Sequence, residues 1–424
     1  MSGLAANRRP EFDLMRAFVV AGLVVFHSAV VFAAGTSWFV KDPRPSAGFT
    51  VCLLWGSLWG MPLLFLVSGM AARYAMRTRS VAAFARERLA RLGVPFVVGL
   101  IVLVPPMFYL GSLASPGFHE PYWRFWLSFV NVPAIARGLL PRGSWTSGVA
   151  DFDPAHLWFL YVLLVFSVAL LPLFAYLRRP RGRLLTSRLA GLADRHGAVV
   201  VWAAAIPMMA VEAVFGPDVN TGGWERTVYV FPFVYGFLIA SDPRFEAALR
   251  RCRWPALTVA CGATGALVAA AGLTRSVTDL SAGVPPGWSA LQGLAGWAWI
   301  AGIMGFAGSV APRRAGRAPV TSAPPPAAPR PGWRRAARYA NEAVLPFYLL
   351  HEPVIVAAAW LIVRWHAPLP AKYAVLVIVS FAVTLGLYEA LVRRFRITRL
   401  LFGMKPPQAH RHQSPADGGL AEAQ

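Results

Sequence analysis

The chain has 424 residues, of which 57% are hydrophobic and only 14% are charged. Soluble globular domains are usually about 25% charged, so the composition excludes that class and indicates a polytopic membrane protein. The net charge of +22 does not indicate a nucleic-acid partner, because the basic residues are spread over the segments between the apolar stretches. The three cysteines indicate neither a disulfide framework nor a cysteine-based metal site.

Ten apolar stretches are long enough to cross a bilayer as helices, which takes about 17 to 25 residues each. We therefore predict an all-α bundle of about ten transmembrane helices. The first stretch follows Arg8 and Arg9 as a signal peptide would, but its length favours a retained helix. The predicted spans are 12–34, 49–74, 92–114, 155–177, 198–216, 225–241, 255–273, 287–310, 338–364 and 371–392.

The Lys and Arg residues divide unequally between the two sides of this predicted bundle. Segments on the side of the N-terminus carry 31 of the 41, segments on the other side carry nine, and Arg16 lies within the first predicted span. Cytoplasmic loops of membrane proteins hold the excess of basic residues. The sequence thus predicts a multi-pass protein of the inner (plasma) membrane with both termini in the cytoplasm.

We predict a single membrane domain over residues 1–403. A Pro-rich tract at 312–332 cannot pack a core and predicts a disordered cytoplasmic loop, and residues 404–424 predict a disordered tail. The longest outer loop, 115–154, contains the aromatic run 122–126, which is typical of a segment at the membrane interface.

Two ionisable residues lie on one face of the first predicted helix. Arg16 and His27 are eleven positions apart, close to three helical turns, and are therefore separated by roughly 16 Å along the axis. Ionisable groups inside a span are costly and usually mark a function, although a satisfied structural histidine is the alternative.

The ninth predicted helix carries a second polar pair. A helix that begins near Arg338 places His351 and Glu352 roughly 20 Å along its axis, close to the roughly 22 Å depth of His27. The two histidines can therefore share a cavity, with Glu352 as a proton partner. The alternative is that His351 and Glu352 only hold neighbouring helices together.

A basic segment lies between the second and third spans. Arg88 and Arg91 share a helical face there, an arrangement suited to phosphate groups, although positive-inside anchoring explains the charges equally well. Ser68 and Gly69 precede this segment, and a glycine at that position allows close backbone approach to a ligand or to another helix.

The fourth predicted helix begins with His156, followed by Trp158. Aromatic residues are expected at this level as an interface belt. A histidine and a tryptophan at the mouth of a cavity would also suit stacking on a sugar ring. We therefore treat both residues as candidates for acceptor binding.

Five motifs resemble those of the acyltransferase family 3 membrane proteins, in the same order along the chain. The likeness covers residues 9 to 403. The motif HLWFL and the C-terminal segment RRFRITRLLFGMKP together resemble the branch of the family that contains glucan-modifying members. One departure is Met70, where the family usually has Phe. The motifs are DLMRAFVVAGLVVFHS with Arg16 and His27, PLLFLVSGM ending at Met70, Arg88-Leu-Ala-Arg91, HLWFL from His156, and LPFYLLHEP with His351 and Glu352.

This resemblance implies transfer of an acyl group, often acetyl or succinyl, from cytoplasmic acyl-CoA to a hydroxyl of a carbohydrate or glucan at the outer face. Arg16 would orient the donor, and His27 would act as a base or as a transient acyl carrier. Arg88 and Arg91 would hold CoA, while Ser68 and Gly69 would shape its tunnel. No tightly bound cofactor or metal is expected, since acyl-CoA enters as a substrate.

A function of another class fits the same residues. A proton-coupled transporter or a flippase of lipid-linked or sugar substrates would use His27, His351 and Glu352 to relay protons or to line a path. Inverted repeats would favour this alternative, and the sequence has no recognisable repeat.

Overall fold

The computed structural model describes residues 10–130, 154–216, 224–273, 286–310 and 332–404. This part of the chain is helical, and its only β-type pairing is an isolated bridge between Ala33 and Ser46. The Pro-rich loop and the C-terminal tail predicted above, as well as most of the loop after residue 130, lie outside the described residues.

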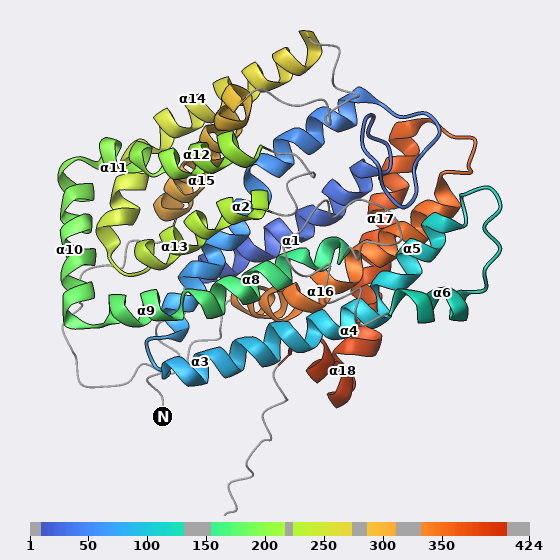
Figure 1. Cartoon of the computed structure of the whole chain (residues 1–424), viewed down its shortest axis with the longest axis horizontal. Coiled ribbons are helices and arrows are strands. Elements are labelled where there is room, and N and C mark those ends of the chain that lie inside the picture. Colours follow the sequence, from blue (N-terminus) through green and yellow to red (C-terminus); the bar gives the residue numbers. More distant parts are fainter. Residues whose placement is uncertain (1–9, 131–153, 217–223, 274–285, 311–331, 405–424) are drawn as a thin grey trace, which may run out of the picture.

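The helices form an elongated bundle (Figure 1). They are α1 (Pro10–Val30), α2 (Ala47–Ala75), α3 (Val81–Arg88), α4 (Val94–Val102), α5 (Val104–Ser112), α6 (Tyr122–Phe129), α8 (Trp158–Ala169), α9 (Leu171–Arg178), α10 (Pro180–Arg195), α11 (Gly197–Ala203), α12 (Ala205–Phe215), α13 (Val230–Ile239), α14 (Pro243–Leu273), α15 (Pro286–Val310), α16 (Gly332–Ile362), α17 (Leu369–Leu387) and α18 (Arg396–Leu401). Short 3₁₀ turns η3 (Ala155–Leu157) and η5 (Trp224–Tyr229) and π-helical turns η2 (Leu89–Gly93) and η7 (Tyr388–Val392) complete them.

The predicted polytopic all-α architecture is confirmed. Within the described residues, eight helices are long and apolar enough to cross a membrane. The number is nine if α8 and α9, which meet at a bend of 49° just before Pro172, count as one broken span. The shorter apolar helix Arg226–Ile239 matches the short sixth span of the prediction. The ten predicted stretches thus correspond to eight long spans, one bent pair and one short helix.

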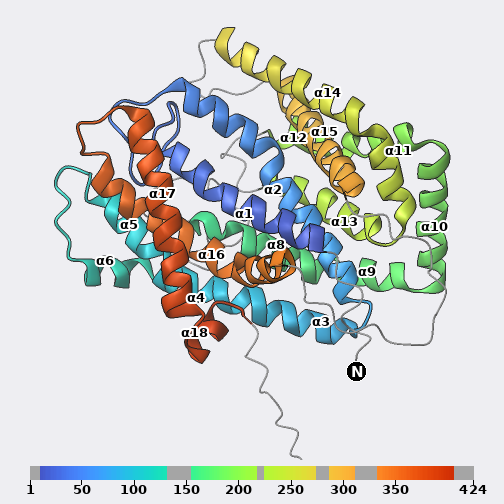
Figure 2. The same ribbon diagram turned by 180° about the vertical axis from the view of Figure 1, so that it is seen from behind.

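Two groups of helices pack against α2. On one side, α1 lies along α16, which in turn packs on α17 and α5. On the other side, α2 contacts α13 and α15, and α15 packs along α12 and α14. Figure 2 shows this division from behind, with α14 and α15 set apart from α1, α16 and α17. The contact between α1 and α16 brings the two halves of the predicted polar site together.

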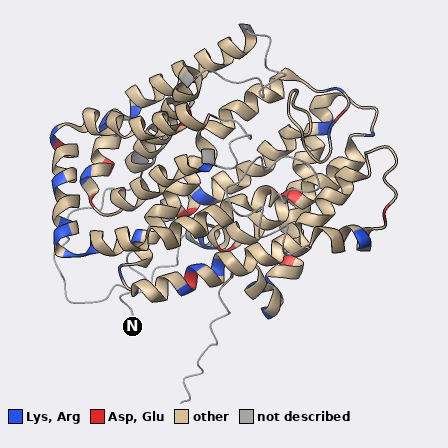
Figure 3. Ribbon diagram, in the orientation of Figure 1, with Lys and Arg blue, Asp and Glu red and all other residues tan. Residues whose placement is uncertain are grey.

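One end of the bundle is rich in basic side chains. Lys and Arg residues line α10 and α3, near the end at which α1 begins (Figure 3). Helix α10 runs across this end, between α9 and α11 (Figure 1). It buries only small residues such as Gly182 and Ala190, and exposes leucines together with arginines. Such a pattern is typical of a helix that lies in the membrane interface.

At the other end, the segment between α1 and α2 folds back over the end of α1. The backbone N–H of Asp42 donates to Val31 O, and that of Ser46 donates to Phe32 O. The Asp42 carboxylate also accepts a hydrogen bond of 2.6 Å from Lys372 of α17, and both side chains are buried. This ion pair fixes the segment to α17.

Candidate active site

Three buried or half-buried histidines and one glutamate meet between α1, η3 and α16. Glu352 Oε2 lies 3.0 Å from His27 Nδ1 and 3.5 Å from His156 Nδ1. His351 stands against both other histidines, with ring centroids 5.1 Å from His27 and 5.5 Å from His156. We call His27, His156, His351 and Glu352 the histidine cluster.

The cluster is assembled from separate parts of the chain by helix packing. His27 lies in the last turn of α1, and His351 and Glu352 lie in the middle of α16, which runs along α1. His27 therefore lies close to His351 and Glu352, as the sequence predicted. His156, which we predicted to bind the acceptor, also lies near the carboxylate of Glu352.

His156 is held by its backbone as well as by its ring. The hydroxyl of Tyr348 donates to His156 O, and His156 Nε2 lies 3.2 Å from Leu349 O. The preceding residue, Ala155, has a φ of 48°. A non-glycine residue in this left-handed region is strained, so the surrounding contacts must enforce the turn that directs His156 toward Glu352.

The hydrogen-bond partners fix how protons can be placed in the cluster. A backbone carbonyl only accepts, so His156 Nε2 and His351 Nδ1, which lies 2.5 Å from Tyr348 O, must each carry a hydrogen. His351 Nε2 is then a lone pair without a partner among the described residues, and His156 Nδ1 faces Glu352 Oε2. That nitrogen lies 3.5 Å from the carboxylate oxygen and makes no hydrogen bond to it.

The same geometry would also suit a metal ion. Ligand atoms of His27, His351 and Glu352 lie within 4.8 Å of one another, and imidazole with carboxylate is a donor set that zinc accepts. Glu352 Oε2 and the facing histidine nitrogens otherwise lack hydrogen-bond partners among the described residues. Either a proton or a metal ion can therefore satisfy these atoms.

The three arginines predicted to contact the donor lie near one another, toward the opposite end of α1 from His27. Arg16 interacts electrostatically with Arg91 and Asp13, and Arg88 interacts with both Arg16 and Arg91. The Arg-x-x-Arg segment spans the junction of α3 and the π-helical turn η2. Because π-turns displace side chains from the regular helical positions, they are frequent at functional sites. Three guanidinium groups thus share one end of the bundle, roughly 16 Å along α1 from His27.

Arg88 and Arg91 have different surroundings within this group. The Arg88 guanidinium stacks over the Phe84 ring at 4.9 Å. Arg91 Nε donates to Gly403 O at 3.1 Å, so Arg91 also anchors the segment that follows α18. A role in stability is therefore visible for Arg91, whereas Arg88 has its charged group on an aromatic face.

Ser68 and Gly69 lie where α2 crosses α13. A Cβ at Gly69 would overlap Phe233 O, and a Cβ at Gly236 would overlap Leu66 O. The two glycines therefore let the helix backbones touch, which is the helix-packing alternative noted for Gly69. Contact of Ser68 or Gly69 with a donor stays a prediction.

Trp158 lies beside the histidine cluster rather than in it. Its ring is 5.4 Å from that of Tyr229, and the Arg226 guanidinium stacks over it at 5.0 Å. Another aromatic neighbour, Trp38 of the segment between α1 and α2, has its ring 6.3 Å from that of His27. No sequence motif singled out Trp38, and only the folding back of its segment brings it to the cluster.

A model of the acyltransferase domain matches residues 9–389. The chain belongs to the acyltransferase family 3 membrane proteins. It is also similar to proteins named Glucans biosynthesis protein C from Salmonella paratyphi B, Salmonella heidelberg and Salmonella enteritidis PT4, with 21% identity to each over 179 residues. That match covers 42% of this chain and 42% of each relative. No solved structure matches the chain.

Membership of this family makes the protein a membrane O-acyltransferase and favours the enzyme over the transporter. His27 and Arg16 stand in the first motif that carries the resemblance, Arg88 and Arg91 in the third, and His351 and Glu352 in the last. The structure adds that the first and last of these motifs meet in the histidine cluster. The acyl donor, the acceptor and the side of the membrane are the subject of the proposal that follows.

Proposed function

We propose that this protein transfers an acyl group, acetyl or succinyl, from cytoplasmic acyl-CoA to a hydroxyl of a carbohydrate or glucan acceptor at or beyond the outer face of the membrane. The family supports acyl transfer to a hydroxyl. The names of the similar Salmonella proteins support a glucan. The contact between Glu352 and His27 carries the mechanism, because it gives a histidine inside the bundle a carboxylate partner.

His27 is the proposed base. With a hydrogen on Nδ1 that points to Glu352, the His27 imidazole presents the lone pair of Nε2, and this nitrogen takes the proton of the acceptor hydroxyl. The acceptor oxygen then bonds to the thioester carbonyl carbon, the bond from carbon to sulfur breaks, and CoA leaves as a thiolate that takes up a proton. General base catalysis of this kind contributes about 10² to 10⁴ in rate.

The donor is proposed to bind at the arginine end of α1. Its phosphate groups are polyanionic and match the guanidinium groups of Arg88 and Arg91, with Arg16 directed to the acyl end. The reactive arm must then extend along α1 toward His27. If the arm does not reach the acceptor, Nε2 of His27 attacks the thioester itself and carries the acyl group as an acyl-imidazole. The acceptor oxygen then attacks the carbonyl carbon of this intermediate, and the bond from carbon to Nε2 breaks.

A labelled donor tests this proposal in proteoliposomes. Acyl transfer from labelled acyl-CoA should fall by about 10² or more in the His27→Ala variant, whereas His366→Ala, which changes an exposed histidine after α16, should transfer at the wild-type rate. Retention of the label on wild-type protein after rapid acid quenching, and not on His27→Ala, would identify the acyl-carrier route. Wild-type turnover in correctly inserted His27→Ala would refute the role of His27.

A further inference from the structure

A cavity of about 450 Å³ opens beside the histidine cluster, at the end of the bundle away from the arginines. It lies between α1, α2, α12, α14 and α15, with η5 at its side. Its volume falls within the usual range for small-molecule sites, about 300 to 1,000 Å³. No motif of the sequence marked this cavity.

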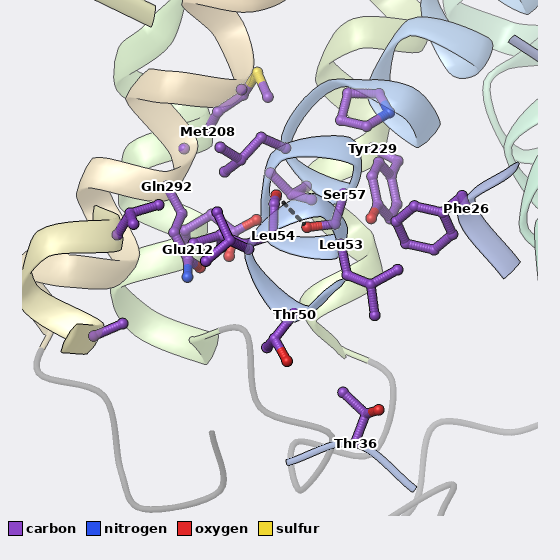
Figure 4. Close-up of a pocket in the computed structure, with 18 of the residues that line it drawn as sticks. Phe26, Thr36, Thr50, Leu53, Leu54, Ser57, Met208, Glu212, Tyr229 and Gln292 are labelled. Carbon is purple, nitrogen blue, oxygen red and sulfur yellow. Dashed lines mark hydrogen bonds between the residues drawn. The ribbon is translucent and has the colours of Figure 1, made fainter. Parts of the chain in front are cut away.

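The walls of the cavity are largely aliphatic, with aromatic side chains on one side and polar side chains on the other. Figure 4 shows Phe26 and Tyr229 on one side and Glu212 with Gln292 on the other. Thr50 and Ser57 of α2 add hydroxyl groups. A sugar ring has the matching surface, since its C–H faces pack on aromatic rings while its hydroxyls need hydrogen-bonding partners.

The hydroxyls of this wall have their own hydrogens already engaged. Thr50 Oγ1 donates to Ala34 O at 2.8 Å, and Ser57 Oγ donates to Leu54 O at 2.9 Å (Figure 4). Toward a ligand, each of these hydroxyl oxygens can therefore only accept a hydrogen bond, and the carboxylate of Glu212 is also a hydrogen-bond acceptor. Together with the amide of Gln292, which both donates and accepts, these groups can bind the hydroxyls of a ligand.

The aromatic side of the cavity adjoins the histidine cluster. The Phe26 ring is 5.5 Å from that of His27, and Tyr229 stands 5.4 Å from Trp158, two residues after His156. Phe26 rests on α2 at Gly56, where an added Cβ would lie 2.8 Å from its ring. Phe26 thus lines the cavity and is in ring contact with the proposed base.

We infer that this cavity is the acceptor subsite and takes a sugar unit whose hydroxyl passes Phe26 to reach His27. The inference rests on the proposed function and adds where the acceptor binds and which chemistry selects it. It also gives Trp158 a place, since this residue backs Tyr229 in the cavity wall.

Filling the cavity tests the inference by kinetics. In nanodiscs, with labelled acetyl-CoA and a short glucose oligosaccharide, Ser57→Phe should raise the KM for the oligosaccharide by about tenfold or more and leave the KM for acetyl-CoA unchanged. The matched control is Ser128→Phe on α6, because Ser128 is also exposed and donates to the carbonyl three residues earlier. An unchanged oligosaccharide KM in Ser57→Phe, or a raised acetyl-CoA KM, would overturn the inference.

A binding measurement separates this inference from the proposed reaction. With Cys52, Cys252 and Cys261 replaced by alanine, a Ser57→Cys variant should react with a membrane-impermeant maleimide, and the oligosaccharide should slow that reaction by about tenfold at saturation, but not in Ser128→Cys. Protection without acyl transfer would mean that the proposed reaction is wrong and the subsite right. Transfer by the wild-type protein without protection would mean the reverse.

Discussion

Glu352 Oε2 lies 3.0 Å from His27 Nδ1, which joins the middle of α16 to the last turn of α1 through a buried carboxylate. In the Glu352→Gln variant the side chain keeps its shape but loses the charge that orients His27. We expect kcat to fall by about 10² to 10⁴, as when the carboxylate behind a catalytic histidine is neutralised, with little change in the KM for acyl-CoA. Steady-state kinetics in nanodiscs gives both constants.

The matched control for this variant lies on the same helix. Glu342 pairs with Arg399 at 2.8 Å and is remote from the histidines, so Glu342→Gln should keep the wild-type kcat. A role of Glu352 confined to structure would lower the unfolding temperature of Glu352→Gln and leave the pH profile of kcat in place. We expect the pH profile of kcat to shift in Glu352→Gln, in addition to the fall in kcat.

The parts of the site that the sequence predicted are those fixed by helix length. Apolar runs locate the spans, and the rise per residue places His27, His351 and Glu352 at the same depth. Helix periodicity likewise predicts that Arg88 and Arg91 stay together at one end. These inferences need no knowledge of which helices are neighbours.

The remaining features depend on contacts that no local pattern contains. His156 reaches Glu352 through a strained turn that Tyr348 of α16 holds, and the sequence showed only a histidine at the start of a helix. The bend between α8 and α9, the folding back of the segment with Trp38, and the cavity are set by tertiary packing in the same way. The sequence predicted close backbone approach at Gly69, but it could not show that the approaching backbone is that of α13.

The buried ion pair between Lys372 and Asp42 should be sensitive to loss of one partner. Both side chains are almost fully buried, 1% and 0% exposed, so Lys372→Met leaves an unpaired carboxylate and should destabilise the fold by about 3 to 5 kcal/mol. The double variant Lys372→Met/Asp42→Leu should recover most of the loss. Thermal unfolding in detergent measures both.

An exposed pair provides the comparison. Asp194 and Arg251 lie 3.5 Å apart with 54% and 50% of their side chains exposed, so Asp194→Asn should change stability by less than about 1 kcal/mol. If the double variant were as unstable as Lys372→Met, the loss would come from the second hydrogen bond of Lys372, to Val363 O, and not from the unpaired charge.

The crossing of α2 and α13 predicts equal effects from two glycines. Gly69→Ala and Gly236→Ala should each force the backbones apart and destabilise the protein by about 1 to 3 kcal/mol. Gly60→Ala, with open space around its Cβ, should be neutral or stabilising by up to about 1 kcal/mol. A specific rise in the KM for acyl-CoA in Gly69→Ala, absent from Gly236→Ala, would instead assign Gly69 to the donor tunnel.

Arg88 should contribute to donor binding alone, whereas Arg91 should contribute both to donor binding and to stability. Loss of one charge-assisted hydrogen bond weakens binding by about 1.5 to 3 kcal/mol, so Arg88→Ala should raise the Kd for acyl-CoA by about 10- to 100-fold at unchanged stability. Arg91→Ala should also lower the unfolding temperature, because Gly403 O loses its donor. Arg86→Ala, on the exposed side of α3, is the control. Equal affinity in Arg88→Ala and Arg86→Ala would leave these charges as topology signals.

Removal of metal ions tests which species satisfies the histidine cluster. If the cluster works without a metal ion, activity in buffers treated with a strong chelator should equal that of untreated protein, and metal analysis should find far less than one zinc per chain. In that case a zinc ion bound by His27, His351 and Glu352 would block the reaction, because it would bind the carboxylate that orients His27. Zinc added in excess should then inhibit, and His351→Gln should relieve that inhibition by removing one ligand. Loss of activity on chelation with recovery on adding zinc would instead make His27 a metal ligand and move the base to another group.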